Sequence, residues 1–524
     1  MLHCAFYQQS LLEVDPEELR LPTASFERGL RGALPRLVST DDFRELHPSA
    51  DGAPTCDPLV LTAMLLLQFR YALPDEELIT RCRCDLRFRY ALALKRGEVP
   101  PSVASLKRFR AAIREKKGAD WLFGLSLRLP IAAGLVNADE LQGVDSTNTD
   151  CRGAVIDTYN LIATAIRQVL RVVARVLGRD VAELAHAWEA KRYLARSVKG
   201  QAAIDWSNEA ARNALLTSEI LDVERIAVRV EKSGVTMPEE VTAALTFMRQ
   251  VATQDVEKLP DGTWRIAEGT VPGRIVSVTD PEARHGRKSA SKTITGFKTH
   301  VTGTLDSQFV TGIVATDAGK HDAVPTPELI RQTEKVELKP KEMTGDAAYG
   351  TGANRRACAA LGVSLYTKLG TPGHKGFTKR DFAIDLEAMS VTCPAGHTTT
   401  THTMVKAQSG PEERVAQFRF PKETCEACPL REKCGSTTAS GRGRLVLLNP
   451  YEAEIQEAQR FNAKPEAKSI LRKRSAIERL LAHLVRMGMR QARFFGLHRV
   501  QFQAYMTAAA YNLQRYFTLT SAAL

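Results

Sequence analysis

Residues 141–148 read Leu-Gln-Gly-Val-Asp-Ser-Thr-Asn, a short strand-like run that gives way to small polar residues. We expect a β-strand through Val144 that ends at Asp145, so that this carboxylate faces a cleft and not a core. A similar run at 343–350, Met-Thr-Gly-Asp-Ala-Ala-Tyr-Gly, predicts another strand that ends at Asp346. The glycine before this acid permits a tight exit from the strand. Aspartates in such positions also cap the segments that follow them, and that alternative stays open.

A third acid, Glu478, lies in the run Arg-Ser-Ala-Ile-Glu-Arg-Leu-Leu, which predicts a basic amphipathic helix. At ~100° per residue Glu478 falls at the edge of one apolar stripe, formed by Ile477, Leu480, Leu481, Leu484 and Val485. Between residues 471 and 499 it is the only acid among eight bases: Arg472, Lys473, Arg474, Arg479, Arg486, Arg490, Arg493 and Arg499. A surface ion pair with Arg474, four residues earlier, is the simple interpretation. The other is a metal ligand, because carboxylates from strand ends and a helix can bind a pair of Mg²⁺ ions.

The remaining chain predicts an α/β order with a large helical insertion after the first strand. A β-rich stretch at 274–318 contains three runs with turn residues between them, which suits adjacent antiparallel strands. The segments that we expect are a mostly helical region at 1–125, a helical stretch at 154–256, strands from 274, 296 and 309, a helix from Pro327, a helix at 353–361, a strand from Val363 and helices at 451–517.

Composition and charge describe an ordinary globular protein with a preference for a polyanionic partner. The chain has 524 residues and 44% hydrophobic residues, and its formal charge is 72 − 60 = +12. Such a length suggests about two to four domains, and such a charge favours nucleic acid as a partner, although a merely soluble basic protein fits equally well. No secretory signal and no run of ~20 apolar residues is present, so we expect no membrane span. Ten cysteines in such a chain suggest a reducing cytoplasm.

A basic helix near residue 105 is a candidate DNA contact. The segment from Ser102 opens with a capping serine and places Lys107, Arg108 and Arg110 on one short helix. A helix, a break at Gly97 and a basic helix would suit a helix-turn-helix reader. A plain helical hairpin has the same pattern, so both interpretations remain.

Four cysteines predict a zinc site in the segment 371–445, which is rich in Gly, Pro and Thr. Cys425, Cys428 and Cys434 are closely spaced, and Cys393 precedes them in Cys-Pro-Ala-Gly-His. Loop-borne thiolates of this kind can complete a tetrahedral Zn²⁺ site and stiffen a segment that has few apolar residues. Cys393 is the expected fourth ligand and His397 its competitor. Four ordinary reduced cysteines are the alternative.

On these motifs the chain resembles a bacterial insertion-sequence transposase of the DDE type. The resemblance rests on Asp145-Ser-Thr, Thr279-Asp-Pro-Glu-Ala-Arg, Gly296-Phe-Lys-Thr-His, Gly345-Asp-Ala-Ala-Tyr-Gly and the glutamate helix. Related transposases have a Tyr-x2-Arg-x3-Glu-x6-Lys signature around the third acid. Arg474 and Glu478 match it here, whereas Leu471 and Val485 stand at its tyrosine and lysine positions.

The resemblance implies a ribonuclease-H-like catalytic core, a mixed sheet flanked by helices, with Asp145, Asp346 and Glu478 as its metal-binding acids. It also implies an all-α N-terminal domain and a small Cys-rich insertion. The expected domains are a helical DNA-binding domain at 1–125, the first part of the core at 135–370 with the helical insertion at 154–256, a Cys-rich zinc insertion at 371–445, and C-terminal helices at 446–524 that complete the core.

The implied function is transposition, in which two Mg²⁺ (or Mn²⁺) ions support DNA cleavage and strand transfer. The partners would be double-stranded DNA, at the element's terminal inverted repeats and at the target, and a second copy of the chain, because two ends must be joined. The expected DNA contacts are Lys107, Arg108, Arg110, Lys298, Arg474, Arg479 and Arg486. We expect a cytoplasmic, nucleoid-associated protein. The alternatives are a non-catalytic DNA-binding protein of transposase ancestry and a ribonuclease-H-like nuclease.

Overall fold

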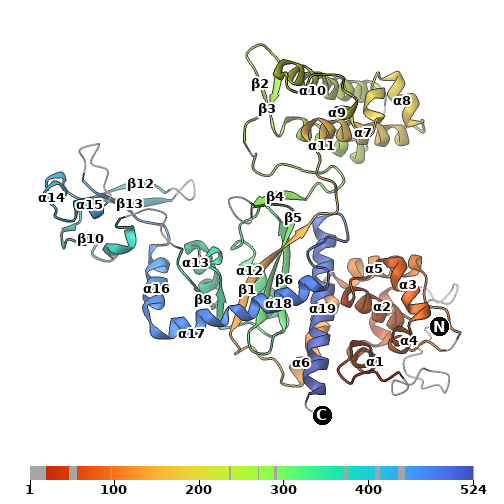
Figure 1. Cartoon of the computed structure of the whole chain (residues 1–524), viewed down its shortest axis with the longest axis horizontal. Helices are drawn as coiled ribbons and strands as arrows, with labels where there is room; N and C mark the ends of the chain where they lie inside the picture. The colour runs from red at the N-terminus through yellow and green to blue at the C-terminus, as the bar shows by residue number, and fades with distance from the viewer. Residues whose placement is uncertain are drawn as a thin grey trace.

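A mixed β-sheet lies at the centre of the computed structural model (Figure 1). The structure describes residues 19–46, 56–95, 97–234, 238–269, 271–287, 292–370, 376–407, 413–434 and 443–522. The strands of the central sheet are β1 (Gln142–Asp150), β4 (Arg284–Arg287), β5 (Thr293–Thr304), β6 (Val310–Asp317), β7 (Glu342–Gly345) and β8 (Ser364–Thr367). The chain is therefore a mixed α/β protein, as the sequence predicts.

Strand β1 separates the antiparallel and the parallel parts of this sheet. Along one edge it pairs antiparallel with β5, from Gln142 opposite Thr304 to Asp150 opposite Gly296. Along its other edge it pairs parallel with β7, which in turn pairs parallel with β8. The second edge of β5 holds β4 and then β6, both antiparallel. All other segments connect to the molecule through this sheet or through the helices on it.

Strand β1 is longer than the sequence predicts, and the expectation that it ends at Asp145 is wrong. Its pairing with β5 continues for five residues beyond that acid. The partner strand explains the difference, because β5 supplies backbone hydrogen bonds to the polar residues Ser146 to Asp150 that local sequence alone does not favour in a strand.

One of the three strands predicted between 274 and 318 is also absent. Residues 274–278 form only an isolated bridge between Ile275 and Arg284. The side chain of Gln254 makes the hydrogen bonds that a neighbouring strand would otherwise make. Ile275 N donates to Gln254 Oε1 at 2.8 Å, and Gln254 Nε2 donates to Ile275 O at 3.1 Å. The backbone of Ile275 is thus satisfied without a ladder.

Helices cover both faces of the sheet. On one face lie α18 (Ser475–Arg486) and α19 (Leu497–Ser521), which follow α16 (Glu452–Ala463) and α17 (Pro465–Lys473). On the other face, α12 (Thr326–Lys335) and α13 (Gly352–Ala360) form a core with Val144, Met343 and Tyr349. Because side chains alternate along a strand, Gly143 and Asp145 face α18 while Val144 faces α12.

Two glycines allow α18 to approach the sheet closely. Gly143 and Gly303 are opposite each other in the β1–β5 pair. A Cβ atom at Gly143 would lie 2.9 Å from Ile477 Cβ and 2.6 Å from Leu305 Cδ2. At Gly303 it would lie 2.7 Å from Leu480 Cδ1. Ile477 and Leu480, both fully buried, fill the space that two side chains would occupy.

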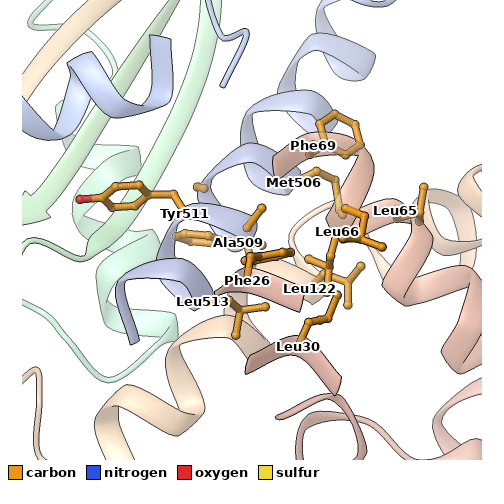
Figure 2. Packing of buried hydrophobic residues seen from close by; sticks show 14 of the residues in the cluster. Phe26, Leu30, Leu65, Leu66, Phe69, Leu122, Met506, Ala509, Tyr511 and Leu513 are labelled. Carbon is orange, nitrogen blue, oxygen red and sulfur yellow. The ribbon is translucent and has the colours of Figure 1, made fainter. Parts of the chain in front are cut away.

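The N-terminal helices pack against α19 in one continuous core. They are α1 (Phe26–Leu37), α2 (Pro58–Arg70), α3 (Asp75–Cys84), α4 (Leu86–Ala91), α5 (Val103–Ala112) and α6 (Trp121–Ala132). Figure 2 shows Phe26, Leu66 and Leu122 from three of these helices around Met506 and Ala509 of α19. Helix α2 begins at Pro58. The predicted cap of α5 is present, because Ser102 Oγ accepts from Ser105 N at 3.2 Å.

Two further groups of elements are attached to the sheet (Figure 1). The predicted helical stretch after β1 is present and has its own core. It comprises α7 (Thr158–Val176), α8 (Val181–Ala187), α9 (Val198–Gln201), α10 (Glu209–Lys232) and α11 (Glu239–Thr253), followed by β2 (Val256–Lys258) and β3 (Trp264–Ile266). The segment before α16 contains two small sheets, from β9 (Ala383–Asp385), β10 (Ser390–Thr392) and β11 (Thr398–Thr399) and from β12 (His402–Lys406), β13 (Arg414–Arg419) and β14 (Leu445–Leu447), with α14 (Lys422–Glu426) and α15 (Arg431–Cys434).

In the part of the chain that the structure describes, none of the helices combines the length and the apolar character that crossing a bilayer requires.

The glycine pair generates a prediction about stability. Gly143→Ala and Gly303→Ala should each lower the free energy of unfolding by about 1–3 kcal/mol, because the added methyl group would push α18 from the sheet. Urea unfolding followed by circular dichroism measures the change. Gly124→Ala in α6 is a matched control, since its new Cβ would meet Val336 at an ordinary 4.0 Å. An equal free energy of unfolding for all three variants would contradict the proposed packing constraint.

Candidate active site

Asp145 and Asp346 lie side by side at the point where the pairing between β1 and β7 ends. The parallel pairing of β1 with β7 ends at Val144 opposite Gly345, and the two aspartates are the next residue on each strand. Residues in register on parallel strands share a face, so we infer that both carboxylates lie on the face covered by α18. The two acids, 201 residues apart in sequence (346 − 145), therefore meet at one position of the sheet.

The environment of Asp145 disfavours its negative charge. Its pKa is raised to about 6, mainly by burial and in smaller part by the charges of Asp346 and Glu478. The hydrogen bond from Ser146 N to Oδ1, at 2.8 Å, and the charge of Arg474 act in the opposite direction. The three acids named by the sequence are thus close enough to repel one another.

Asp346 also serves as a cap, which was the competing interpretation of this residue. Its Oδ1 accepts from Ala348 N at 2.9 Å and from Tyr349 N at 3.4 Å, at the start of the short 3₁₀ helix Ala347–Tyr349. Within the described residues, no hydrogen bond to its Oδ2 is seen. One carboxylate oxygen orients the side chain, and the other is available to a ligand.

Glu478 lies in the first turn of α18, beside the residue that packs on Gly143. The predicted stripe is present: Ile477, Leu480, Leu481 and Leu484 are buried, and Val485 is half-buried. The predicted surface pair is present too, because Arg474 Nη2 lies 2.8 Å from Glu478 Oε1. The side chain of Glu478 is 52% exposed, so its carboxylate borders both the acidic site and solvent.

Two comparisons with protein families match opposite ends of the chain. Residues 392–517, which contain Glu478, match the model "Transposase DDE domain". Residues 17–112, which contain α1 to α5, match the model "Transposase domain (DUF772)". Both matches support the identification of the chain as an insertion-sequence transposase of the DDE type. Asp145 and Asp346 lie between the two matched ranges, so their assignment rests on the geometry above and on the resemblance.

No curated protein matches the chain, and no solved structure does.

A buried polar network lies behind the carboxylates, on the face of the sheet opposite α18. Tyr349 Oη and His300 Nδ1 are 3.2 Å apart, and His300 Nε2 is 3.1 Å from Thr316 Oγ1. Burial lowers the pKa of His300 to about 4, and burial together with Asp322 and Asp145 raises that of Tyr349. Both groups are therefore neutral near pH 7 and add no charge to the site. Sequence analysis missed His300, although it lies in the quoted Gly-Phe-Lys-Thr-His run.

The predicted DNA contacts divide into exposed and internally paired cations. Lys107, Arg108, Arg479 and Arg486 are exposed. Arg110 is buried and pairs with Asp75 at 2.7 Å, and Lys298 is buried with its Nζ 2.8 Å from Asp322 Oδ1. The charge of Lys298 is satisfied inside the protein, so we leave it out of the proposed DNA surface.

The four predicted cysteine ligands line one small cavity of about 30 Å³, together with His397 and an apolar wall from Phe382 and Phe420. The backbone N–H of Arg444 donates to Cys425 Sγ at 3.4 Å, and the guanidinium donates to Cys434 O at 3.0 Å. Cys393 precedes the other three cysteines by 32 residues or more (425 − 393 = 32), and the fold brings all four to one cavity. Outside this segment, Cys82 is buried in the N-terminal core and Cys84 is exposed.

Neither the carboxylates nor the cysteines form a preformed metal site. Among the residues that the structure describes, no three His, Cys, Asp or Glu side chains are arranged to hold an ion together. The donor chemistry nevertheless fits. Carboxylate oxygens suit Mg²⁺ or Mn²⁺, and the repulsion at Asp145 is what a cation would relieve, while thiolates suit zinc.

Asp145 should make stability depend on pH in an unusual direction. Since its folded-state pKa is about 6 and its unfolded-state pKa ~3.9, the folded protein binds this proton more tightly between those values. The free energy of unfolding should fall as pH rises through this window, by up to about 3 kcal/mol. Asp145→Asn should remove that loss, so the variant should be more stable than the wild type at about pH 7.5 and similar to it at about pH 4.

Urea unfolding at both pH values, in metal-free buffer, measures the effect. Asp150→Asn is the control, because this acid is exposed on the same strand and its replacement should leave the pH dependence unchanged. An Asp145→Asn variant no more stable than the wild type at about pH 7.5 would argue against the buried, charge-crowded site.

Proposed function

We propose that this transposase cleaves and rejoins DNA at a site formed by Asp145, Asp346 and Glu478 in a ribonuclease-H-like core. The observation that supports it most is the position of two aspartates side by side where β1 and β7 separate, next to the helix that contains Glu478. The mixed sheet with helices on both faces is compatible with that core. The family matches favour transposition over general nuclease activity.

The carboxylates would hold two divalent cations, Mg²⁺ or Mn²⁺. Such ions lower the pKa of an attacking water or 3′-hydroxyl and stabilise the leaving oxygen of a phosphodiester. The protein's own contribution is positional. Ser146 N orients one oxygen of Asp145, and Ala348 N orients one oxygen of Asp346. Hydrogen bonds of this kind fix the carboxylates before substrate arrives, which reduces the cost of ordering them during reaction.

Arg474 would act as a phosphate contact beside the acids. In the free protein its guanidinium pairs with Glu478, which holds both side chains at the edge of the site. A DNA phosphate can replace the carboxylate as the guanidinium's partner, and Glu478 is then released toward the two aspartates. Arg479 and Arg486, exposed on the same helix, would contact the backbone further along.

The second candidate function is DNA binding without cleavage. The Arg474–Glu478 pair and the capping role of Asp346 favour it, because both give the acids a structural purpose. In either case the partners are DNA ends and a second copy of the chain, and the boundaries proposed for the domains remain 1–125, 135–370, 371–445 and 446–524.

Cleavage of DNA that carries the flanks of this gene's locus tests the catalytic proposal. With Mg²⁺ or Mn²⁺, the wild type should nick or join strands at fixed ends. Asp145→Asn, Asp346→Asn and Glu478→Gln should each reduce the rate at least about 100-fold, since even outer-shell partners of a metal contribute 10- to 100-fold. Glu466→Gln on α17 is a matched control, exposed and outside the site. Tight binding without any cutting by the wild type would establish the second candidate instead.

We further propose that Cys393, Cys425, Cys428 and Cys434 bind a structural zinc ion. Their convergence on one cavity supports this, and the N–H of Arg444 at Cys425 Sγ would stabilise a thiolate. Metal analysis of the purified protein should find about one zinc per chain, and Cys425→Ser with Cys428→Ser should remove it. The exposed Cys84→Ser is the control. A protein purified without zinc that gains neither zinc nor stability when zinc is added would refute the proposal.

A further inference from the structure

A large cavity with a strongly basic lining lies where the N-terminal helices meet the C-terminal segment 487–507. Its volume is about 950 Å³. Six cations line it, Lys107, Arg110, Arg114, Arg152, Arg493 and Arg499, against two acids, Asp75 and Glu76. We call this site the basic cavity. Its lining has a net charge of 6 − 2 = +4, and it is separate from the acidic site.

The cations of the basic cavity are held in place but only partly neutralised. Asp75 pairs with Arg110 at 2.7 Å and also accepts from Gln68 Nε2 at 2.7 Å. Arg493 donates to the backbone oxygen of Leu73, and its pKa falls to about 10 through burial and the nearby charge of Arg110. Arg110 is 6% exposed, and among the described residues its Nε has no hydrogen-bond partner. Asp75 offsets part of the repulsion between these two guanidinium groups, and the remaining positive charge of the lining suits a bound anion.

Aromatic rings fix the orientation of two of these guanidinium groups. Arg110 lies over the ring of Phe494 with 5.4 Å between guanidinium carbon and ring centre, and Arg493 lies 5.3 Å over Phe69. Both rings line the basic cavity. Guanidinium groups stacked in this way lose little freedom when they bind a phosphate, because their planes are already set.

The basic cavity is connected to the acidic site through β1. Arg152 lies two residues after Asp150, the last residue of that strand. The end of the strand is held to the C-terminal segment, because Asp150 N donates to Arg490 O at 2.7 Å. A second cavity is lined by Thr147, Asn148 and Arg490. Two of these residues, Thr147 and Asn148, lie between Asp145 and Arg152 in the chain. From Asp145 to Arg152 is 152 − 145 = 7 residues, which at ~3.3 Å per residue is about 23 Å.

We propose that the basic cavity binds the phosphodiester backbone of the DNA substrate about seven base pairs from the scissile phosphate, at ~3.4 Å per base pair. The predicted distance rests on the proposed function, whereas anion binding in the cavity does not. Because one wall belongs to α3 and α5 and the other to residues 487–507, a bound strand contacts the N-terminal helices and the C-terminal segment together. The cavity positions DNA, and it takes no part in the chemical step.

Fluorescence anisotropy with a labelled duplex containing the element end, in EDTA so that no cleavage occurs, tests the proposal. Arg152→Gln with Arg499→Gln should weaken binding at least about tenfold and reduce the slope of log K against log salt by about two. Both residues are exposed, so folding should be retained. Arg152→Lys with Arg499→Lys preserves the charge and should recover most of the affinity.

Arg331→Gln with Lys335→Gln is the matched control. It removes two charges from α12, on the face of the sheet opposite α18, and should leave binding unchanged. Calorimetry with inorganic phosphate and with a mononucleotide distinguishes a small-anion site from a DNA site. If either binds with micromolar affinity and the cavity substitutions leave duplex binding intact, the proposal is overturned.

Cleavage measured separately with Mg²⁺ distinguishes the two proposals. If the wild type cuts DNA and the cavity variants bind and cut normally, the cavity proposal is wrong and the proposed function stands. If the wild type binds DNA through the cavity and never cuts it, the cavity proposal stands and the proposed function is wrong.

Discussion

The close contact of α18 with a pair of glycines determines the geometry of the whole site. Gly143 and Gly303 face each other across β1 and β5, and Ile477 and Leu480 occupy the space above them. Asp145 lies two residues after Gly143 on the same face, and Glu478 directly follows Ile477. The packing that seats the helix therefore also sets how far its glutamate lies from the sheet's aspartates. A well-packed interior transmits such constraints because it has little free space.

This geometry has an electrostatic cost that the rest of the fold offsets. Asp145 is largely buried near two other acids, and burying like charges together is unfavourable. Arg474 compensates in part through its pair with Glu478, and neutral His300 and Tyr349 satisfy each other on the opposite face. Carboxylates with strongly shifted pKa values are typical of functional sites. Stability alone would not favour such a group of acids, because their mutual repulsion destabilises the fold.

Sequence reasoning found the local features of this site and missed those that depend on distant partners. Asp145, Asp346 and Glu478 were identified because each lies in a readable strand or helix pattern. The length of β1 could not be predicted, because β5, about 150 residues later, supplies its hydrogen bonds.

The same limit applies to charge. Lys298 looked like a DNA contact, and nothing local reveals that Asp322 neutralises it. Arg110 was predicted on the same ground, yet it is buried beside Asp75, 35 residues earlier. Cysteine spacing likewise predicts which sulfurs meet, as they do around one cavity, but not the distances that would define a metal site.

The connection between the N-terminal helices and the central sheet is a shared core and not a flexible linker. Helix α19 is buried over most of its surface, with α2 and α6 against one side and β6 against another. The N-terminal helices and the sheet cannot move apart without exposing Phe26, Leu66 and Met506, and burying such side chains stabilises by roughly 1.5–3 kcal/mol each. DNA held by α5 would therefore be positioned relative to the acids by packing alone. The basic cavity lies at this junction. The shared core would therefore fix the distance between DNA bound in the cavity and the three acids.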